Sequence, residues 1–493
     1  MTTRSALVAT AAASLLLLAT TTLSAQTSDV AVPSPGVSKV RIVRLSEVKG
    51  KVELDRNNGR GYEPGITNLP IVENSKLKTG EGVAEIEFED NSSLRVAPDS
   101  IVEFPQLERM ATGGTASTVH LVQGMAYVSL MKSNNNQFNL TFGDQNLALP
   151  SPSHIRLQLN GTEAKLAVLD GNLHMAALDA SKKKTVTFDL LQHQPPTVAK
   201  DILPEPYDEW DQTSSGYHAR AANMSAFNGS PYSYGLNDMA YYGSFVNGCG
   251  GGSMWRPYFA SAAWDPYSNG AYAYYQGAGY SWVSPYPWGW TPYHTGSWNF
   301  CEGTGWGWQP GGGWNGLNNI ASYPQSGVGG GGGTRLIRQP APPVHPPRPG
   351  EPTMVAVSLK PVVRSEISSR NSFTFRNDSA GLGVPRDGFG KLNKVAENVQ
   401  HQGSINQQIY LNAPASTMQG GRVTNTSVMA GSIHRGTPPA SSMGGQGGNS
   451  GAYSGRSGGQ SGSSMSSMSS SPHVSAPSSS PSSAPASSGR PSH

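Results

Sequence analysis

Two scarcities limit what this chain can be: charged side chains are few, and cysteine is nearly missing. Charged residues make up 14% of the 493 residues, and only two residues are cysteines. The 11 histidines follow none of the usual metal-binding spacings. No nucleophile elbow or phosphate-binding loop stands in a strand-to-helix setting. The sequence therefore predicts no catalytic site, no metal site and no cofactor.

Acidic residues are missing from the end of the chain, since none follows Glu397. The formal net charge of +3 thus combines a net acidic first part with a basic, serine-rich end. The arginines of that end are scattered singly, and no recognised nucleic-acid-binding module accompanies them. Specific nucleic-acid binding is not expected.

Long hydrophobic runs are also missing, except at the N-terminus. Arg4 precedes a charge-free apolar stretch over 6–19, and residues 23–25 end in a small residue suited to cleavage. The stretch is short for a stable membrane span, and no second one follows. We therefore expect a signal peptide over 1–25 and an exported protein, periplasmic or at the cell surface, without a transmembrane span.

After a linker over 26–39, residues 40–191 alternate apolar and polar side chains between frequent turns, which is typical of antiparallel strands. One hairpin, over 84–96, can be predicted in register because facing residues share a side. The expected apolar pairs are Phe88 with Leu94 and Ile86 with Val96. They leave residues 90–92 as a three-residue loop.

The other face of this hairpin carries a row of glutamates. Glu85, Glu87 and Glu89 follow period-2 spacing along one strand, with Glu87 expected opposite Arg95. Catalytic carboxylate pairs face each other across a cleft, which a row on one strand does not do. We therefore expect a solvated strand face.

Several short motifs in this domain resemble the exported FecR domain. The family pattern runs through a Gly-x-Val strand, a Leu-x-Thr-Gly turn, an Asp-Gly-Ser hairpin and a strand entered through Leu-x-x-Gly. The corresponding segments here are 48–52, 74–80, 84–96, 98–100 and 121–127. Asn91-Ser92 replaces the glycine of the hairpin, and asparagine tolerates the left-handed conformation. The resemblance covers roughly residues 40 to 180.

The resemblance implies a β-rich, non-enzymatic periplasmic module. In the iron-transport regulators of that family, the module hangs from a membrane helix joined to a cytoplasmic segment that regulates a sigma factor. Neither is expected here, so the chain looks like the free-standing exported FecR-domain proteins. An aromatic Tyr/Trp/Gly repeat follows the domain in some of them.

All ten tryptophans lie between Trp210 and Trp314, and an aromatic pattern recurs over 232–325 at a spacing of about 26 residues. Three glycine-x-aromatic triplets are each followed, ten residues after the aromatic, by a tryptophan. The pairs are Phe245 with Trp255, Tyr272 with Trp282, and Trp298 with Trp308. A rare residue repeated in register indicates an internal structural repeat, here a small β-repeat module with glycine turns.

The aromatic rings of this module have two possible roles. They can form its core, or they can present an exposed platform for sugars or partner side chains. We expect more than half to be core and the rest to face solvent. The densest cluster is the candidate binding surface: Trp288, Trp290, Tyr293, Trp298, Trp306 and Trp308.

The two cysteines, Cys249 and Cys301, lie in the first and third copies of the repeat. An oxidising compartment favours a disulfide that joins these copies, whereas two free thiols are the alternative. Between the domains, 192–231 is expected to be a linker with a short helix starting near Tyr207. Residues 326–493 are rich in Gly, Pro and Ser and are expected to be mostly disordered, apart from one short strand near Met354.

The sequence thus predicts an all-β protein: an antiparallel FecR-like domain, an aromatic β-repeat module and a long disordered tail. The leading hypothesis is a non-enzymatic envelope protein that binds another envelope protein or a cell-wall polysaccharide through an aromatic surface. The alternative is a signalling module that receives a partner's segment by strand addition. A hydrolase with an unrecognised site has no supporting constellation. The sequence sets no oligomeric state.

Overall fold

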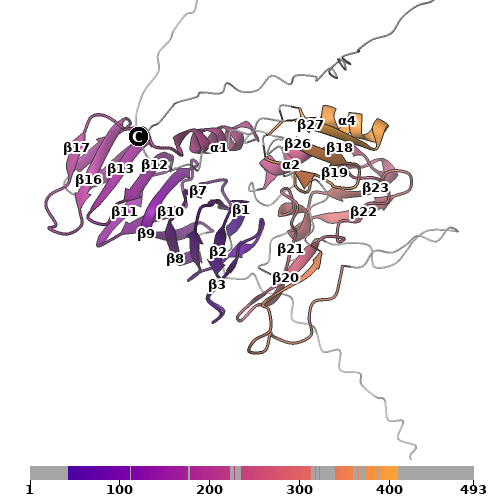
Figure 1. Cartoon of the computed structure of the whole chain (residues 1–493), viewed down its shortest axis with the longest axis horizontal. Coiled ribbons are helices and arrows are strands. Elements are labelled where there is room, and N and C mark those ends of the chain that lie inside the picture. Colours follow the sequence, from indigo (N-terminus) through magenta and orange to yellow (C-terminus); the bar gives the residue numbers. More distant parts are fainter. Residues whose placement is uncertain are drawn as a thin grey trace, which may run out of the picture. The chain divides into compact units, whose positions relative to one another are not determined.

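The computed structural model describes residues 41, 43–110, 113–175, 178–221, 227, 235–312, 317, 321, 339–358, 364–365, 372–386, 388–389 and 391–408. The predicted signal peptide and the linker over 26–39 lie outside these residues. The described chain is mainly antiparallel β-sheet, as predicted (Figure 1). Among the described residues, no helix is long and apolar enough to cross a membrane.

The first part of the chain consists of strands. They are β1 (Val43–Lys49), β2 (Val52–Asp55), β3 (Tyr62–Pro64), β4 (Pro70–Ile71), β5 (Lys76–Thr79), β6 (Val83–Glu87), β7 (Ser93–Val96), β8 (Ile101–Arg109), β9 (Thr115–Leu130), β10 (Gln137–Phe142), β11 (Gln145–Leu149), β12 (Ser153–Leu159), β13 (Glu163–Asp170), β14 (Asn172–Met175), β15 (Leu178–Ser181), β16 (Lys184–Asp189) and β17 (Thr197–Ala199). Strands β14 and β15 form a separate hairpin, and the other fifteen belong to one sheet.

The 16-residue strand β9 belongs to two branches of this sheet. Its first half pairs with β8 and β10, and its second half pairs with β7 and β12. Gly124 lies between the halves at φ +86°, where a Cβ atom would overlap Ser100. Only glycine fits this crossing. Apolar side chains from both branches then form one core, which includes Leu94, Val119 and Leu166.

The predicted register of the hairpin formed by β6 and β7 is wrong by two residues. The structure pairs Ile86 with Leu94 and Glu85 with Arg95. Phe88 N donates to Ser92 O at 2.8 Å, so the loop comprises residues 89–91. Because a two-residue shift leaves every side chain on its original face, alternation alone does not distinguish the two registers.

The aromatic region contains three hairpins. Their strands are β18 (Gly243–Asn247) with β19 (Ser253–Pro257), β20 (Gly270–Tyr275) with β21 (Gly279–Val283), and β22 (Ser297–Cys301) with β23 (Gly305–Gln309). The cross-strand pairs are Phe245 with Trp255, Tyr272 with Trp282, and Trp298 with Trp308. The three sequence copies therefore have the same register. Helix α2 (Leu236–Tyr242) precedes the first hairpin, and the 3-10 turn η2 (Cys249–Gly251) lies between its two strands. The short helix α3 (Thr291–His294) lies between the second and third hairpins.

A glycine begins each copy because the tryptophan ring of the same hairpin occupies the space of a side chain. A Cβ on Gly243 would overlap the Trp255 ring, and one on Gly270 would overlap the Trp282 ring. A Cβ on Gly296 would lie 2.6 Å from Nε1 of the equivalent tryptophan. The recurring Gly-x-aromatic motif is thus a packing requirement.

The first and third hairpins form one sheet, in the order β18-β19-β23-β22. The second hairpin pairs instead with β24 (Met354–Ser358) and lies between two cores. From its strand β20, Ala273 and Tyr275 join the core of the first domain, whereas Tyr272 joins the core of aromatic rings. This hairpin joins the two regions through apolar contact on both of its faces.

The folded part extends beyond the predicted boundary at residue 325. Besides β24, it contains β25 (Arg364–Ser365), β26 (Ser372–Arg376), α4 (Leu392–Gln402) and β27 (Ser404–Gln408). Phe375 and Val399 are fully buried in the aromatic core. The predicted short strand near Met354 is present as β24. The prediction of disorder is wrong for β25, β26, α4 and β27, because apolar residues at strand and helix spacing occur within a glycine- and proline-rich context. The end of the chain lies outside the described residues.

Replacing Gly270 by alanine tests the packing requirement of the repeat. We expect a loss of about 1–3 kcal/mol in the free energy of unfolding, because the added methyl overlaps the Trp282 ring. Urea unfolding followed by tryptophan fluorescence measures it. Gly216→Ala is the matched control, since a methyl added at that helical position would meet open space. An equal effect of both variants would contradict the requirement.

Candidate functional site

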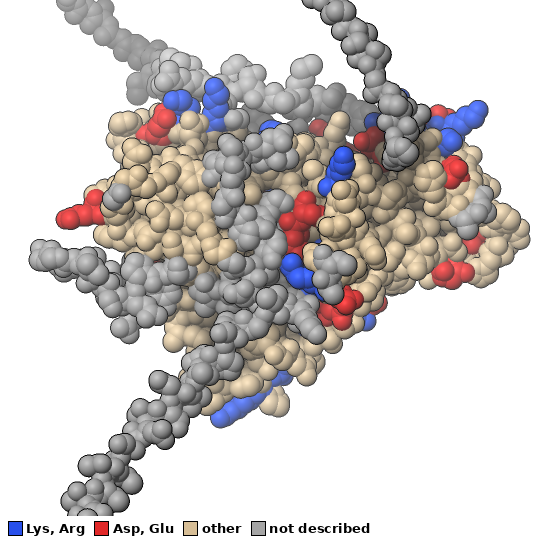
Figure 2. Space-filling view, turned by 180° about the vertical axis from the view of Figure 1, so that it is seen from behind, with Lys and Arg blue, Asp and Glu red and all other residues tan. Residues whose placement is uncertain are grey.

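Charged side chains occur inside this protein as well as on its surface. Figure 2 shows one face of the protein, on which Lys, Arg, Asp and Glu side chains are sparse and scattered. Several of the charged residues are instead inside: Arg44, Arg95, Glu85, Glu87 and Asp238 have no exposed surface. Buried charges are rare unless they are paired, so their location marks the part of the protein with a specific polar arrangement.

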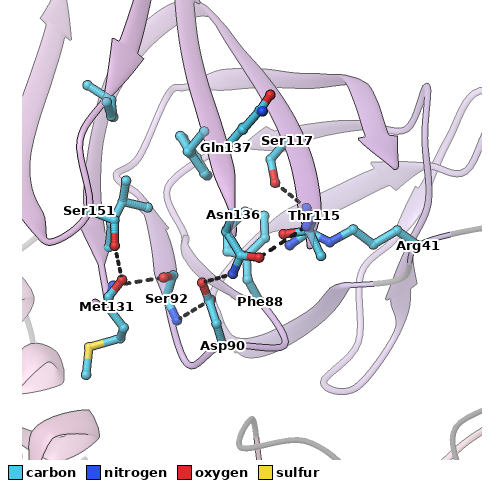
Figure 3. Close-up of a pocket in the computed structure, with 13 residues that line it drawn as sticks. Arg41, Phe88, Asp90, Ser92, Thr115, Ser117, Met131, Asn136, Gln137 and Ser151 are labelled. Atoms are coloured by element: carbon cyan, nitrogen blue, oxygen red, sulfur yellow. Dashed lines mark hydrogen bonds between the residues drawn. The ribbon is translucent and has the colours of Figure 1, made fainter. Parts of the chain in front are cut away.

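A small hollow in the first domain is too small for an organic ligand. Its lining includes Arg41, Phe88, Asn136 and Leu149, and its water-accessible volume is about 20 Å³ (Figure 3). That volume suits roughly one ordered water molecule. Arg41 is the cationic residue of this lining, and its Nε donates to Glu89 Oε2 at 2.7 Å. The hollow is therefore not a substrate site.

The buried charges begin with a row of polar side chains across one face of the sheet. Cross-strand pairing aligns residues from β6, β7, β9 and β12. We call them the polar row: Glu85, Arg95, Tyr127 and Arg156. All four are at most 5% exposed. This is the face that alternation predicts to be solvated, and that prediction is wrong for Glu85, Glu87 and Glu89, which are at most 7% exposed.

Helix α1 (Asp208–Ala221) covers the polar row, and its presence agrees with the predicted helix after Tyr207. Four of its side chains contact the sheet at spacings of three and four residues, which places them on one helix face. We call them the α1 stripe: Asp208, Asp211, Ser215 and His218. A polar stripe on the helix therefore meets a polar row on the sheet.

At one end of this contact, the sheet supplies donors and the helix supplies carboxylates. Arg156 Nη1 lies 2.6 Å from Asp208 Oδ1, and the Tyr127 hydroxyl donates to the same oxygen at 2.9 Å. Arg95 Nη1 lies 2.8 Å from Asp211 Oδ1. The Arg95–Asp211 pair is shielded from water, whereas the Asp208 side chain of the other pair is 32% exposed.

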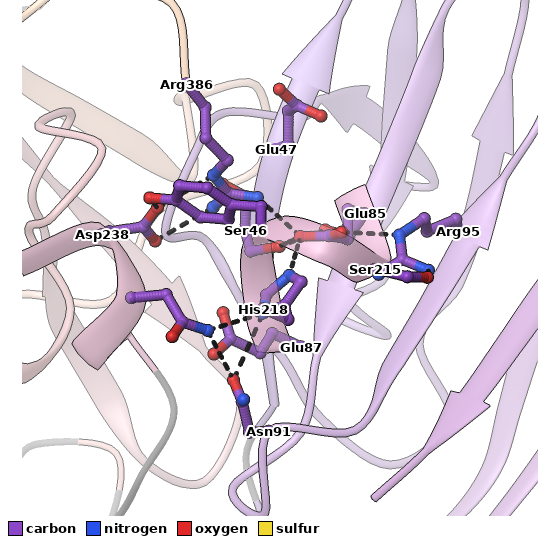
Figure 4. A network of polar contacts seen from close by, with 12 residues as sticks. Ser46, Glu47, Glu85, Glu87, Asn91, Arg95, Ser215, His218, Asp238 and Arg386 are labelled. Atoms are coloured by element: carbon purple, nitrogen blue, oxygen red, sulfur yellow. Dashed lines mark hydrogen bonds and ion pairs between the residues drawn. The ribbon is translucent and has the colours of Figure 1, made fainter. Parts of the chain in front are cut away.

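At the other end the charges are reversed. Glu85 Oε1 lies 2.9 Å from His218 Nε2, and Glu85 Oε2 accepts from Arg95 Nε at 2.8 Å (Figure 4). Burial opposes ionisation of Glu85, but the charges of His218, Arg386 and Arg95 outweigh it. The pKa of Glu85 therefore lies well below its usual value.

Arg44 and helix α2 add a second set of ion pairs beside the row. Arg44 Nη2 lies 2.5 Å from Glu87 Oε2 and also pairs with Asp238 of α2. Gly235 N, just before that helix, donates to Glu87 Oε1 at 2.8 Å. Burial opposes ionisation of Asp238, yet Arg386 and Arg44 hold its pKa below the usual value.

Arg386 enters the same place from far along the chain. Its Nη1 donates to Glu85 Oε1 at 2.6 Å, and its Nε donates to Asp238 Oδ1 at 2.9 Å. The guanidinium also lies 5.2 Å from the centre of the Tyr217 ring. Its side chain is 7% exposed. One arginine thus connects the sheet, both helices and the segment that precedes α4.

The charges of this arrangement are paired between segments of the chain. Its carboxylates, Glu85, Glu87, Asp211 and Asp238, each pair with at least one cation inside the protein. Charge complementarity of this kind mainly fixes which segment binds and in which register. Among the described residues, no group of His, Cys, Asp and Glu could hold a metal ion.

The predicted aromatic binding surface is not a surface. The six residues Trp288, Trp290, Tyr293, Trp298, Trp306 and Trp308 are at most 4% exposed. The Trp288 ring, for example, contacts the rings of Trp255, Trp264, Tyr286 and Tyr293. Stacking on a sugar needs an open ring face, so the assignment of these residues as a binding platform is wrong. The large rings are needed to build a core from short strands.

Cys249 and Cys301 form a disulfide, with their Cα atoms 5.5 Å apart. The bond joins the first and third hairpins, which share a sheet. Two free thiols, the alternative at the level of sequence, do not occur in this structure.

Sequence reasoning missed the residues of the polar contact. The available signal was the spacing of Asp208, Asp211, Ser215 and His218, which fits one helix face, together with the alternating charges of the 84–96 hairpin. Either pattern by itself is typical of a solvated surface. Only their complementarity indicates that one covers the other.

Two family models match parts of the chain. Residues 75–174 match the family described as FecR protein, and residues 236–326 match a family of unknown function, DUF6600. The chain therefore carries a FecR-like module, as the sequence motifs predicted. The second match spans the three aromatic hairpins. Helix α1 and Arg386 lie outside both matched ranges. No curated protein matches the chain.

Two crystal structures of a protein from Parabacteroides distasonis, described as a "putative anti-sigma factor", resemble part of the chain. The identities are 9% and 8%, and the TM-scores are 0.23 and 0.22. Each comparison covers 32% of this chain and 68% of the other. With such low scores we base no argument on them.

Removing Arg386 tests how much the polar contact stabilises the fold. We expect Arg386→Ala to lower the free energy of unfolding by about 3–5 kcal/mol, because buried Glu85 and Asp238 each lose a cation. Chemical denaturation measures it. Arg376→Ala is the matched control, since that arginine is exposed on the neighbouring strand β26. A loss below about 1 kcal/mol, the usual scale of surface pairs, would contradict the buried role.

The same contact predicts acid sensitivity. The pKa values of Glu85 and Asp238 lie below their usual values of 4.5 and 3.8. Their ionised forms therefore stabilise the fold above about pH 4.5, and this stabilisation is lost as the pH falls through and below that range. Urea midpoints between about pH 7 and pH 3 measure the loss. In the Glu85→Gln variant the urea midpoint should change less with pH. An unchanged pH dependence of the midpoint in that variant would count against the role of Glu85.

Proposed function

We propose that this is an exported, non-enzymatic envelope protein whose FecR-like module works by binding protein segments, as in signal perception. The observation that carries the proposal is the polar row, which already takes up two separate segments of the same chain. Helix α1 and Arg386 both bind there through complementary charges. Arg44 beside the row binds a third segment, α2. A sheet face that recognises several segments in this way is suited to recognise a segment of another protein.

Export is supported by two independent features. The N-terminal sequence has the pattern of a signal peptide, with Arg4 before an apolar stretch over 6–19. The disulfide between Cys249 and Cys301 suits an oxidising compartment. FecR domains are usually periplasmic, which agrees with both. The described part of the chain adds no membrane-spanning helix.

A protein partner is favoured over a polysaccharide. Sugar recognition by stacking needs exposed aromatic rings, and the rings of the densest cluster are inside the core. A non-catalytic role is favoured because the charged groups that gather at the polar row neutralise one another and present no reactive group to a substrate.

Cross-linking in the envelope tests the proposal. The full chain, tagged and produced in its own cells, should occur in the envelope fraction without residues 1–25. Its two cysteines should react with maleimide only after reduction. An amine-reactive cross-linker should then join it to a membrane-associated protein, and excess untagged chain should compete with this product.

The controls separate the two partner classes. An unrelated exported protein with the same tag should give no such product. Selective retention on isolated peptidoglycan or capsular polysaccharide, without a cross-linked protein, would contradict a protein-binding role. Cytoplasmic protein with free thiols and an intact N-terminus would contradict export.

A further inference from the structure

The contact between α1 and the sheet is polar on both sides. The α1 stripe presents Asp208, Asp211, Ser215 and His218, and the polar row presents two arginines, a tyrosine hydroxyl and a glutamate. Separating these surfaces returns charged groups to water, which solvates them well. Large apolar contact from α1 is limited to Trp210 and Tyr217, which are 8% and 4% exposed.

Helix α4 shows the opposite kind of contact. It is buried through Leu392, Val395, Ala396 and Val399, which join the aromatic core. Uncovering these side chains would expose apolar surface at a cost of about 25 cal/mol per Å². The chain therefore holds one helix by apolar burial and another mainly by charge complementarity. Interfaces that stay soluble when separated are typical of exchangeable contacts.

We propose that the polar row is the docking surface for a helix of a partner protein, and that α1 covers this surface until the partner's helix replaces it. The inference rests on the proposed protein-binding function and names the surface and the class of partner. The disulfide and the aromatic core stay in place during the exchange, and α2 keeps its ion pair with Arg44. The contacts that α1 makes with α2 through Tyr217 and His218 are released together with its contacts to the row.

The order of charges along the row defines the partner's helix. Arg156 and Arg95 select two acidic side chains one turn apart. Glu85, at the other end, selects a cationic side chain about two turns after the second acid. The partner's helix therefore carries an acidic pair followed by a histidine, lysine or arginine on the same face.

The cover competes with the partner because it belongs to the same chain. An attached segment acts at an effective concentration in the millimolar range, so a free helix of equal strength binds the intact chain weakly. Weakening the cover without changing the row should reveal the surface. The full chain with Asp208→Asn and Asp211→Asn does this, because the arginines of the row are unchanged and Arg95 keeps its pairing with Glu85.

The test uses a fluorescent peptide with the sequence of residues 205–222 as a stand-in for the partner's helix. Fluorescence anisotropy should show at least about tenfold tighter binding to the double variant than to the wild-type chain. The same peptide with both aspartates changed to asparagine should bind at least about tenfold more weakly than the unchanged peptide. The control chain carries Lys394→Gln and Glu397→Gln, which remove an exposed pair on α4, and should match wild type.

Hydrogen exchange of the unmodified chain provides a second measurement. The amides of α1 should exchange through a local opening, faster than those of α4 and strand β9, and added salt should accelerate α1 alone. Exchange of α1 only together with global unfolding would overturn the proposal. So would equal peptide affinity of the two chains, or a dimer formed by exchange of α1 between copies.

These outcomes are distinguishable from failure of the proposed function. Cross-linking to an envelope protein with no peptide binding by the double variant would retain a protein-binding role and reject the polar row as its site. Peptide binding without any envelope partner would show a competent surface and reject the cellular role.

Discussion

The ion pairs around Glu85 are the interaction on which the arrangement of this chain depends. A carboxylate in the middle of a buried sheet face is costly unless cations surround it. Arg95 comes from the neighbouring strand, His218 from α1 and Arg386 from the segment before α4. Segments separated by up to 301 residues therefore meet at one point, and each adds a cation to the same carboxylate. The FecR-like module and the later segments are joined by this electrostatic requirement as well as by the second aromatic hairpin.

Much of the fold could be predicted because its local patterns allow only one structure. Alternation identifies the strands of the first domain, and the recurring glycine and tryptophan positions identify three equivalent hairpins. The glycine is informative because the tryptophan ring excludes a side chain there, as at Gly270. The register of the 84–96 hairpin could not be predicted in the same way. Its apolar faces are satisfied in two registers, and the turn around Asn91, at φ +67°, decides between them.

The site could not be predicted because burial is a property of the partner surface as well as of the residue. Glu85 and Arg95 have the sequence pattern of a solvated strand, and Asp208 and Asp211 that of a solvated helix. Each pattern is correct for an isolated element. The tryptophans of the candidate binding surface are also predicted to be exposed, but they are buried in the core. The core needs these rings because short strands with many glycines supply little other apolar volume.

Apolar contacts and charge-complementary contacts thus have different roles in this protein. Apolar contact between rings is insensitive to charge, so it suits parts that stay together, such as the disulfide-linked sheet. Charge complementarity is directional and fails for any segment with the wrong order of charges. On the FecR-like sheet, the face that carries the polar row makes contacts of this charged kind. Its occupant is therefore selected by sequence, and a segment of another protein with the same order of charges satisfies the same requirement.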